Sequence, residues 1–233
     1  MNADDRWDSL IQYWTEKNWL DVDWRLIKCQ VRRESAFNPK AISPCGATGL
    51  MQIMPATGEY LGVARDKLFN PETNLKTGIA YLKQQYDRFP EIPDRQERLK
   101  FALASYNGGR GYINRAIALA RKEDAPWQNW DGVKTYLAAA DCTIGGKHPD
   151  HRQIIAYVDR IWTDYNRCSP APSSKDRPAV DSRSAVSGVN NRLALPVAEL
   201  LVEDILSPAM EGNREAGEFF GNEDDGWKGD HEL

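Results

Sequence analysis

The sequence predicts an all-α fold for the larger part of its 233 residues. Apolar residues recur three and four positions apart in several stretches, which is the pattern of a helix with one buried face. No stretch alternates convincingly between apolar and polar residues, as a half-buried strand would. The apolar fraction of 41% is sufficient for one ordinary globular core plus additional sequence.

The first predicted helix covers residues 4–19. Four apolar side chains form a single stripe along it: Trp7, Leu10, Ile11 and Trp14. A second helix follows, because Asp21 or Asp23 can cap its amino end, and it is expected to run to about Ser35.

Glu34 lies in the last turn of this second helix, since Asn38 precedes Pro39 and a residue before proline disfavours helical geometry. It shares one face with three apolar residues that precede it: Trp24, Ile27 and Val31. Burial and the negative end of the helix dipole both favour the protonated carboxyl, the form that a general acid needs. Taken alone, Glu34 fits a structural residue that pairs with an arginine better than a catalytic one.

A loop rich in proline and glycine follows, and Thr48 is expected to begin a short helix through Ile53 that Pro55 kinks or ends. Pro71 suits the first turn of a longer helix, and Gly108-Gly109 suits the end of the next one. The later predicted helices cover residues 71–88, 94–106, 111–122, 131–140 and 149–166.

The composition changes at Cys168, which divides the chain into a helical domain at 1–168, a linker at 169–192 and a tail at 193–233. The linker is rich in proline and serine. The tail is acidic and contains a short segment, 193–206, that is apolar enough to dock on a partner. Linker and tail together carry 6 Lys and Arg against 13 Asp and Glu, whereas the helical domain carries 24 against 21.

Charge and composition exclude several classes of protein. The net charge of -4 is far from the basic footprint of a nucleic-acid-binding domain, so no nucleic acid partner is expected. No run approaches the roughly 18 apolar residues of a membrane span, and the acidic amino terminus is unlike a signal peptide. The few histidines and the absence of a Cys-x-x-Cys pair argue against a zinc site, so neither a metal nor a cofactor is expected.

The four cysteines have different surroundings in the predicted helices. Cys29 lies in the second helix, where a small buried residue is expected, and Cys45 lies in the loop that follows. Cys142 and Cys168 flank the last helix and are candidates for a disulfide bond, with free thiols as the alternative.

Three sequence blocks carry a more specific signal. The first contains Glu34-Ser35, Asn38-Pro39, Ser43-Pro44, Gly46-Ala47 and the run from Gly49 to Pro55. The second contains Asn70-Pro71, Asn74, Gly78 and Tyr81-Leu82, the third runs from Ala104 to Gly109, and Tyr157-Val158 is a weaker fourth match. Together they resemble the soluble lytic transglycosylase family, which shares its fold with goose-type lysozyme, over roughly residues 20–165.

The resemblance implies a lysozyme-like helical domain that acts on peptidoglycan. Glu34 would protonate the oxygen of the β-1,4 bond between N-acetylmuramic acid (MurNAc) and N-acetylglucosamine (GlcNAc), then take a proton from the MurNAc C6 hydroxyl. The MurNAc N-acetyl carbonyl would stabilise the cationic carbon, and the product would carry a 1,6-anhydro-MurNAc end. Of the run from Glu34 to Gly58, only Glu34 is a carboxylate, which agrees with such a one-carboxylate mechanism.

By the same resemblance, Ser43 contacts the carboxyl or the substrate, and Gln52 and Met54 line the saccharide site. Tyr106 and Asn107 lie at a helix end, where the tyrosine hydroxyl is expected to hold the N-acetyl group or the catalytic carboxyl. Tyr157 is a further residue of the groove. For Met54 and Tyr157, core packing is the alternative.

One departure from the family pattern leaves the reaction open. The family often has a glutamate four residues before the position of Tyr157, and this chain has Gln153. Lysozyme-type hydrolysis is therefore the alternative reaction, and a non-catalytic glycan-binding or structural protein is the alternative function. Without a signal peptide, delivery to the cell wall is expected in a phage virion, with a lysis system or through a secretion machine, with the tail as the attachment to that assembly.

Overall fold

The computed structural model describes residues 5–168, so the predicted linker at 169–192 and tail at 193–233 lie outside the described residues. Every named element in the described part is a helix, which confirms the all-α prediction. The α-helices are α1 (Asp8–Asn18), α2 (Trp24–Ser35), α3 (Pro55–Tyr60), α4 (Pro71–Asp87), α5 (Arg95–Gly108), α6 (Arg110–Lys122), α7 (Trp130–Val133) and α8 (His151–Cys168). Two 3-10 helices complete the set: η2 (Arg65–Phe69) and η3 (Lys134–Ala138).

Side-chain caps begin helices α2, α4 and α5. The Asp23 carboxylate accepts a hydrogen bond from the amide of Arg25, which makes Asp23 rather than Asp21 the cap of α2. Asn70 and Asp94 cap α4 and α5 in the same way. At the other end of α5, Gly109 has a φ of 87°, which a residue with a side chain would adopt only with strain.

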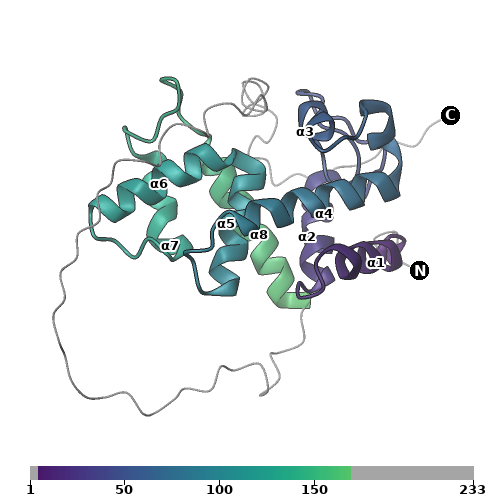
Figure 1. Ribbon diagram of the computed structural model, residues 1–233, viewed down its shortest axis with the longest axis horizontal. Helices are drawn as coiled ribbons and strands as arrows, with labels where there is room; N and C mark the ends of the chain where they lie inside the picture. The colour runs from purple at the N-terminus through teal and green to yellow at the C-terminus, as the bar shows by residue number, and fades with distance from the viewer. Residues whose placement is uncertain (1–4, 169–233) are drawn as a thin grey trace, which may run out of the picture.

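Helix α8, at the carboxyl end of the described chain, packs against both α2 and α5 (Figure 1). Helix α4 in turn lies against α1 and α5. The core between these helices is apolar and closed to solvent; its fully buried members include Leu26, Ile27, Ile79, Leu103 and Val158. None of the helices between residues 5 and 168 is long and apolar enough to cross a bilayer.

The predicted helix at Thr48 is wrong, because this segment is an irregular loop. Gly49 and Gln52 both have positive φ, 81° and 47°, which a right-handed helix does not accommodate. The buried side chain of Asn74 takes the place of helical hydrogen bonds. Its Oδ1 accepts from the amide of Met51 at 2.7 Å, and its Nδ2 donates to the carbonyl of Thr48 at 2.8 Å.

Pro55 therefore begins a helix instead of ending one, since it occupies the first turn of α3. Two further boundaries differ from prediction. The helix expected at 4–19 begins only at Asp8, and the helix expected at 131–140 is the short α7 followed by η3.

All four cysteines are free thiols. Cys142 is buried, with its sulfur 3.7 Å from the carbonyl of Tyr112. Burial raises the pKa of Cys29 to about 12, and the neighbouring thiol of Cys168 adds to that rise. Cys168 thus interacts with Cys29 rather than with Cys142, because α8 packs along α2.

Candidate active site

Three polar side chains from two helices meet at the carboxyl end of α2. The hydroxyl of Tyr157, in the middle of α8, donates a hydrogen bond of 2.5 Å to Oε1 of Glu34. The same hydroxyl accepts a hydrogen bond of 3.0 Å from Nε2 of Gln30. Gln30 and Glu34 stand one turn apart on α2, so both side chains face α8.

Burial sets the charge state of Glu34. It raises the pKa of this carboxyl from its ordinary 4.5 to about 7, against the smaller opposing effects of the Tyr157 hydrogen bond and the charge of Arg33. Across residues 5–168, Glu34 takes part in no ion pair. The carboxyl therefore holds its proton near neutral pH, as a proton donor must.

Tyr106 belongs to the same cluster, but its hydroxyl has a different partner from the one expected. It donates to the carbonyl of Met51 at 2.8 Å, and thereby fastens the loop before α3 to the end of α5. Burial, with the nearby charge of Glu34, raises the pKa of Tyr106 well above its ordinary value. The tyrosine that holds the carboxyl is Tyr157, the residue for which core packing was the alternative.

Ser43 and Gln52 have structural hydrogen bonds inside the loop. Oγ of Ser43 accepts from the amide of Ala47 at 3.0 Å, and this bond closes a tight turn. Nε2 of Gln52 donates to the carbonyls of Ala41 at 3.2 Å and Gly49 at 2.9 Å. Both side chains hold the loop that passes over the end of α2, and neither is bonded to Glu34.

Met54 and Asn107 form no hydrogen bond with Glu34, Tyr157 or Gln30 in the described part of the chain. Met54 is partly buried at the start of α3. Asn107 lies next to Tyr106 at the end of α5, and its Oδ1 is buried with no hydrogen-bond partner in the described part of the chain. A buried acceptor of this kind is suited to a donor from a bound ligand, because leaving it unpaired is costly.

The sequence prediction missed Gln30. The available signal was that Gln30 is a polar residue on the apolar face of α2, one turn before Glu34. In the structure the Gln30 side chain is fully buried. No group of three or more metal-binding side chains occurs among the described residues. Glu34 can donate one proton, and Tyr157 can stabilise the resulting carboxylate.

Comparison with known proteins agrees with these features. The profile of the family described as "Transglycosylase SLT domain" matches residues 9–129, slightly more than half of the chain. The matched range includes Glu34 and Tyr106, whereas Tyr157 lies beyond it.

Two curated relatives carry the name "Membrane-bound lytic murein transglycosylase F". The one from Desulfosudis oleivorans is 36% identical over 151 residues, which are 62% of this chain and 32% of the relative. The one from Photobacterium profundum is 36% identical over 132 residues, or 57% of this chain and 24% of the relative. The chain thus spans about a third or less of the length of these relatives.

Among solved structures, the 70 kDa soluble lytic transglycosylase of Escherichia coli has a similar fold, with a TM-score of 0.52 at 24% identity. The similarity covers 69% of this chain and 24% of that one.

Proposed function

The chain belongs to the transglycosylase SLT domain family, and from this premise we propose that it cleaves the β-1,4 MurNAc–GlcNAc bond of peptidoglycan with Glu34 as acid and then base. The single observation that carries the proposal is the Glu34 carboxyl at the end of α2, which accepts a hydrogen bond from the Tyr157 hydroxyl and whose burial raises its pKa to about 7. It keeps a proton available where most carboxyls have lost theirs. The names of the curated relatives support peptidoglycan as the substrate.

In the first step, Glu34 donates its proton to the oxygen that leaves C1 of MurNAc. The substrate's own N-acetyl carbonyl stabilises the cationic carbon, so the protein needs no nucleophile. In the second step, the Glu34 carboxylate accepts the proton of the MurNAc C6 hydroxyl, whose oxygen closes onto C1. The product carries a 1,6-anhydro-MurNAc end, and Glu34 regains its proton.

Tyr157 acts on the charged form of the acid. Its hydroxyl bond to Glu34 stabilises the carboxylate that exists between the two steps. Gln30 positions Tyr157, because its Nε2 donates to the hydroxyl oxygen and leaves the hydroxyl proton for Glu34. In the substrate complex, Oδ1 of Asn107 accepts a hydrogen bond from a donor on the sugar.

A one-carboxylate reaction is supported by the surroundings of Glu34. Among the described residues, the groups that shift its pKa are Tyr157 and Arg33, and no second carboxylate is among them. Most glycosidases that hydrolyse their substrate use two carboxylates. Hydrolysis is the second candidate reaction, because Gln153 stands where a helper carboxylate is frequent in the family that the chain resembles.

The test is digestion of purified peptidoglycan followed by mass spectrometry of the fragments. We expect 1,6-anhydro ends, each one water lighter than a reducing end, and no effect of EDTA on the rate. Reducing ends alone would assign hydrolysis. If the wild-type protein released no fragments, the alternative of a non-catalytic glycan-binding protein would hold instead.

For residues 169–233 we propose an attachment arm that joins the enzyme to a larger assembly, such as a phage virion or a secretion apparatus. Its support is compositional: a proline- and serine-rich linker, an excess of acidic residues and the apolar segment 193–206. A chain that ends at Cys168 is expected to cleave peptidoglycan about as well as the full chain. It should no longer co-purify with the assembly that the full chain joins. Mass spectrometry of purified virions and of cell-envelope complexes checks the second expectation.

A further inference from the structure

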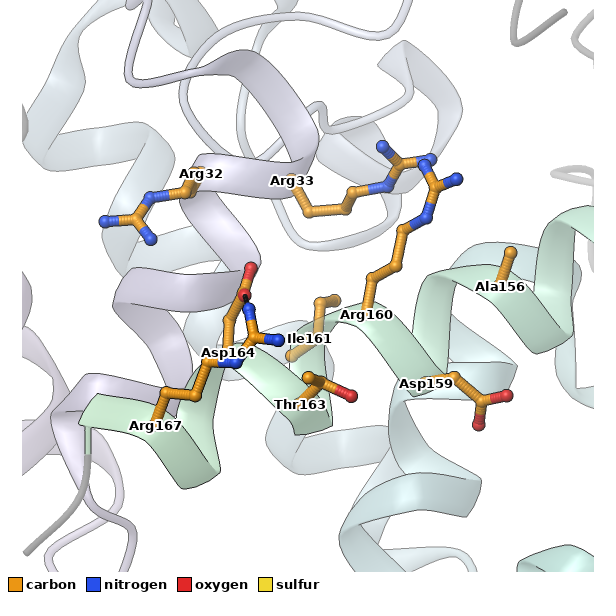
Figure 2. A pocket seen from close by; sticks show the side chains of 9 residues that line it. All are labelled: Arg32, Arg33, Ala156, Asp159, Arg160, Ile161, Thr163, Asp164 and Arg167. Carbon is orange, nitrogen blue, oxygen red and sulfur yellow. Dashed lines mark ion pairs between the residues drawn. The ribbon is translucent and has the colours of Figure 1, made fainter. Parts of the chain in front are cut away.

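A groove of about 610 Å³ lies outside the polar cluster, between the end of α2 and the second half of α8 (Figure 2). Charged side chains dominate its lining: four arginines, Arg32, Arg33, Arg160 and Arg167, and two aspartates, Asp159 and Asp164. We call it the arginine groove. Its lining carries a net positive charge, although the chain as a whole is acidic.

The two aspartates of the arginine groove have cationic partners of their own. Asp164 is 3.9 Å from Arg167, and Asp159 is 3.9 Å from Lys134. Figure 2 shows Asp159 and Arg160 pointing in different directions. In the described part of the chain no carboxylate is within ion-pair distance of Arg160.

Arg33 and Arg160 converge from the two walls of the groove. Figure 2 shows their guanidinium groups side by side, one from α2 and one from α8. Burial, and then the charge of Arg160, lowers the pKa of Arg33, which is the expected effect of a nearby like charge. Two cations held together in this way favour an anion that contacts both.

The two arginines are neighbours in sequence of Glu34 and Tyr157, the hydrogen-bonded pair of the candidate active site. Arg33 precedes Glu34 in sequence, and its charge acts on the Glu34 carboxyl. Arg160 is three residues after Tyr157, about one turn further along α8. Each of the two arginines thus lies within about one helical turn of a residue of the polar cluster.

We propose that Arg33 and Arg160 bind a carboxylate of the peptide that peptidoglycan carries on MurNAc. This inference rests on the proposed function. The peptide is attached to the sugar whose C1 bond breaks, so it leaves the saccharide site close to Glu34. Its free carboxylates are planar acceptors, and a guanidinium offers them two parallel N–H donors.

The test compares two substrates in full-length protein: peptidoglycan strands with their peptides, and the same strands after an amidase has removed the peptides. Arg160→Gln removes one of the two guanidinium groups. The matched control is Arg152→Gln, which removes an exposed arginine from the same helix at a position outside the groove lining.

For Arg160→Gln we expect the ratio of kcat/KM on peptide-bearing strands to kcat/KM on peptide-free strands to fall about tenfold, the effect of one charge-assisted hydrogen-bonded pair. Arg152→Gln should leave the ratio unchanged. An unchanged ratio in Arg160→Gln contradicts the proposal. Faster cleavage of both substrates by Arg160→Gln also contradicts it, because the groove would then hold an inhibitory acidic segment of the chain itself.

A binding measurement separates this inference from the proposed function, since it requires no cleavage. Calorimetry with a soluble peptide that has the sequence and free carboxylates of the wall peptide should show binding that weakens about tenfold in Arg160→Gln and falls with added salt. Equal binding by the wild-type chain and Arg160→Gln, or no binding by either, contradicts the proposal even if the enzyme cleaves peptidoglycan.

Discussion

Two partly buried glutamates, Glu34 at the end of α2 and Glu97 in the first turn of α5, have opposite surroundings. Glu97 accepts from Nζ of Lys100 at 2.7 Å and from the amide of Trp130 at 2.6 Å. Glu34 accepts from the hydroxyl of Tyr157 at 2.5 Å and forms no ion pair within residues 5–168.

The difference shows that partners, and not burial alone, decide what a carboxyl does in this fold. Lys100 and the Trp130 amide match both oxygens of Glu97, so Glu97 joins α5 to α7 and serves the structure. Glu34 accepts a hydrogen bond from one neutral donor, the Tyr157 hydroxyl, and burial then favours the protonated form of the carboxyl. The same residue type is thus held by partners at both carboxylate oxygens in one place and keeps a proton that it could donate in the other.

The largest expected effect is the loss of cleavage in Glu34→Gln. The amide keeps the shape of the side chain but has no acidic proton, so the rate of peptidoglycan lysis should fall about 10²–10⁴-fold. Turbidity of a cell-wall suspension measures the rate, and circular dichroism checks the fold. Lysis within about tenfold of wild type by a folded variant would remove Glu34 from the mechanism.

The same substitution should stabilise the protein at alkaline pH. The folded pKa of Glu34, about 7, is above the ordinary 4.5, so the folded state binds more protons between these values. Wild-type stability therefore falls as pH rises from about 4.5 through 7, and the penalty is complete above 7. With allowance for partial exposure, Glu34→Gln should gain on the order of 2 kcal/mol at pH 8 and little at pH 4. Urea denaturation of both proteins at both pH values measures the free energy of unfolding. If Glu34→Gln raised it equally at pH 4 and pH 8, the charge of the carboxyl would not be the cause.

Tyr157→Phe should have a smaller effect on rate and a defined effect on the pH profile. The hydroxyl bond lowers the pKa of Glu34, so its removal raises that pKa further. We expect kcat/KM to fall about tenfold, as for one hydrogen bond to a charged group, and its alkaline limb to move to higher pH. A rate loss without a shift of that limb would mean that Tyr157 acts through packing.

Glu97→Gln is the matched change at the structural glutamate, and its effect on stability should have the opposite sign. It removes the ion pair with Lys100 while an amide oxygen can still accept from Trp130. We expect a loss of about 1 kcal/mol of unfolding free energy at pH 8, with the rate of cleavage retained. Increased stability in this variant would contradict the contrast between the two glutamates.

The smallest expected effect is that of Gln30→Leu. Oε1 of Gln30 is buried without a partner among the described residues, so an apolar side chain of similar volume should leave stability nearly unchanged. The hydroxyl of Tyr157 would no longer accept a hydrogen bond from Nε2 of Gln30, so its orientation toward Glu34 would be less fixed. We expect cleavage to slow by about threefold. The conservative variant Gln30→Glu retains the length of the side chain but introduces a carboxyl beside Glu34, and should move the alkaline limb to higher pH. If neither variant changed the rate of cleavage or its pH profile, the role of Gln30 would be limited to packing in the core.

The sequence by itself determined helices α2, α4 and α5 and the position of Glu34 at the end of α2. The caps and apolar spacing of α2, α4 and α5 act within one or two turns, so these helices could be predicted nearly to their ends. Glu34 was identified for the same reason, because its position on the apolar face of α2 and before a proline is local information. The resemblance carried by the three sequence blocks supplied the family, which the profile match confirms.

Only the tertiary structure decided what surrounds that acid. Tyr157 is 123 positions from Glu34 in sequence, and they meet because α8 packs against α2. Tyr106 bonds to the carbonyl of Met51 rather than to the carboxyl. The side chain of Asn74, from α4, fixes the position of Met51 by accepting a hydrogen bond from its amide. The periodicity of a sequence gives the helix face on which a side chain lies. Its hydrogen-bond partner depends on which helix packs against that face, and this packing is decided by the burial of apolar residues across the whole core.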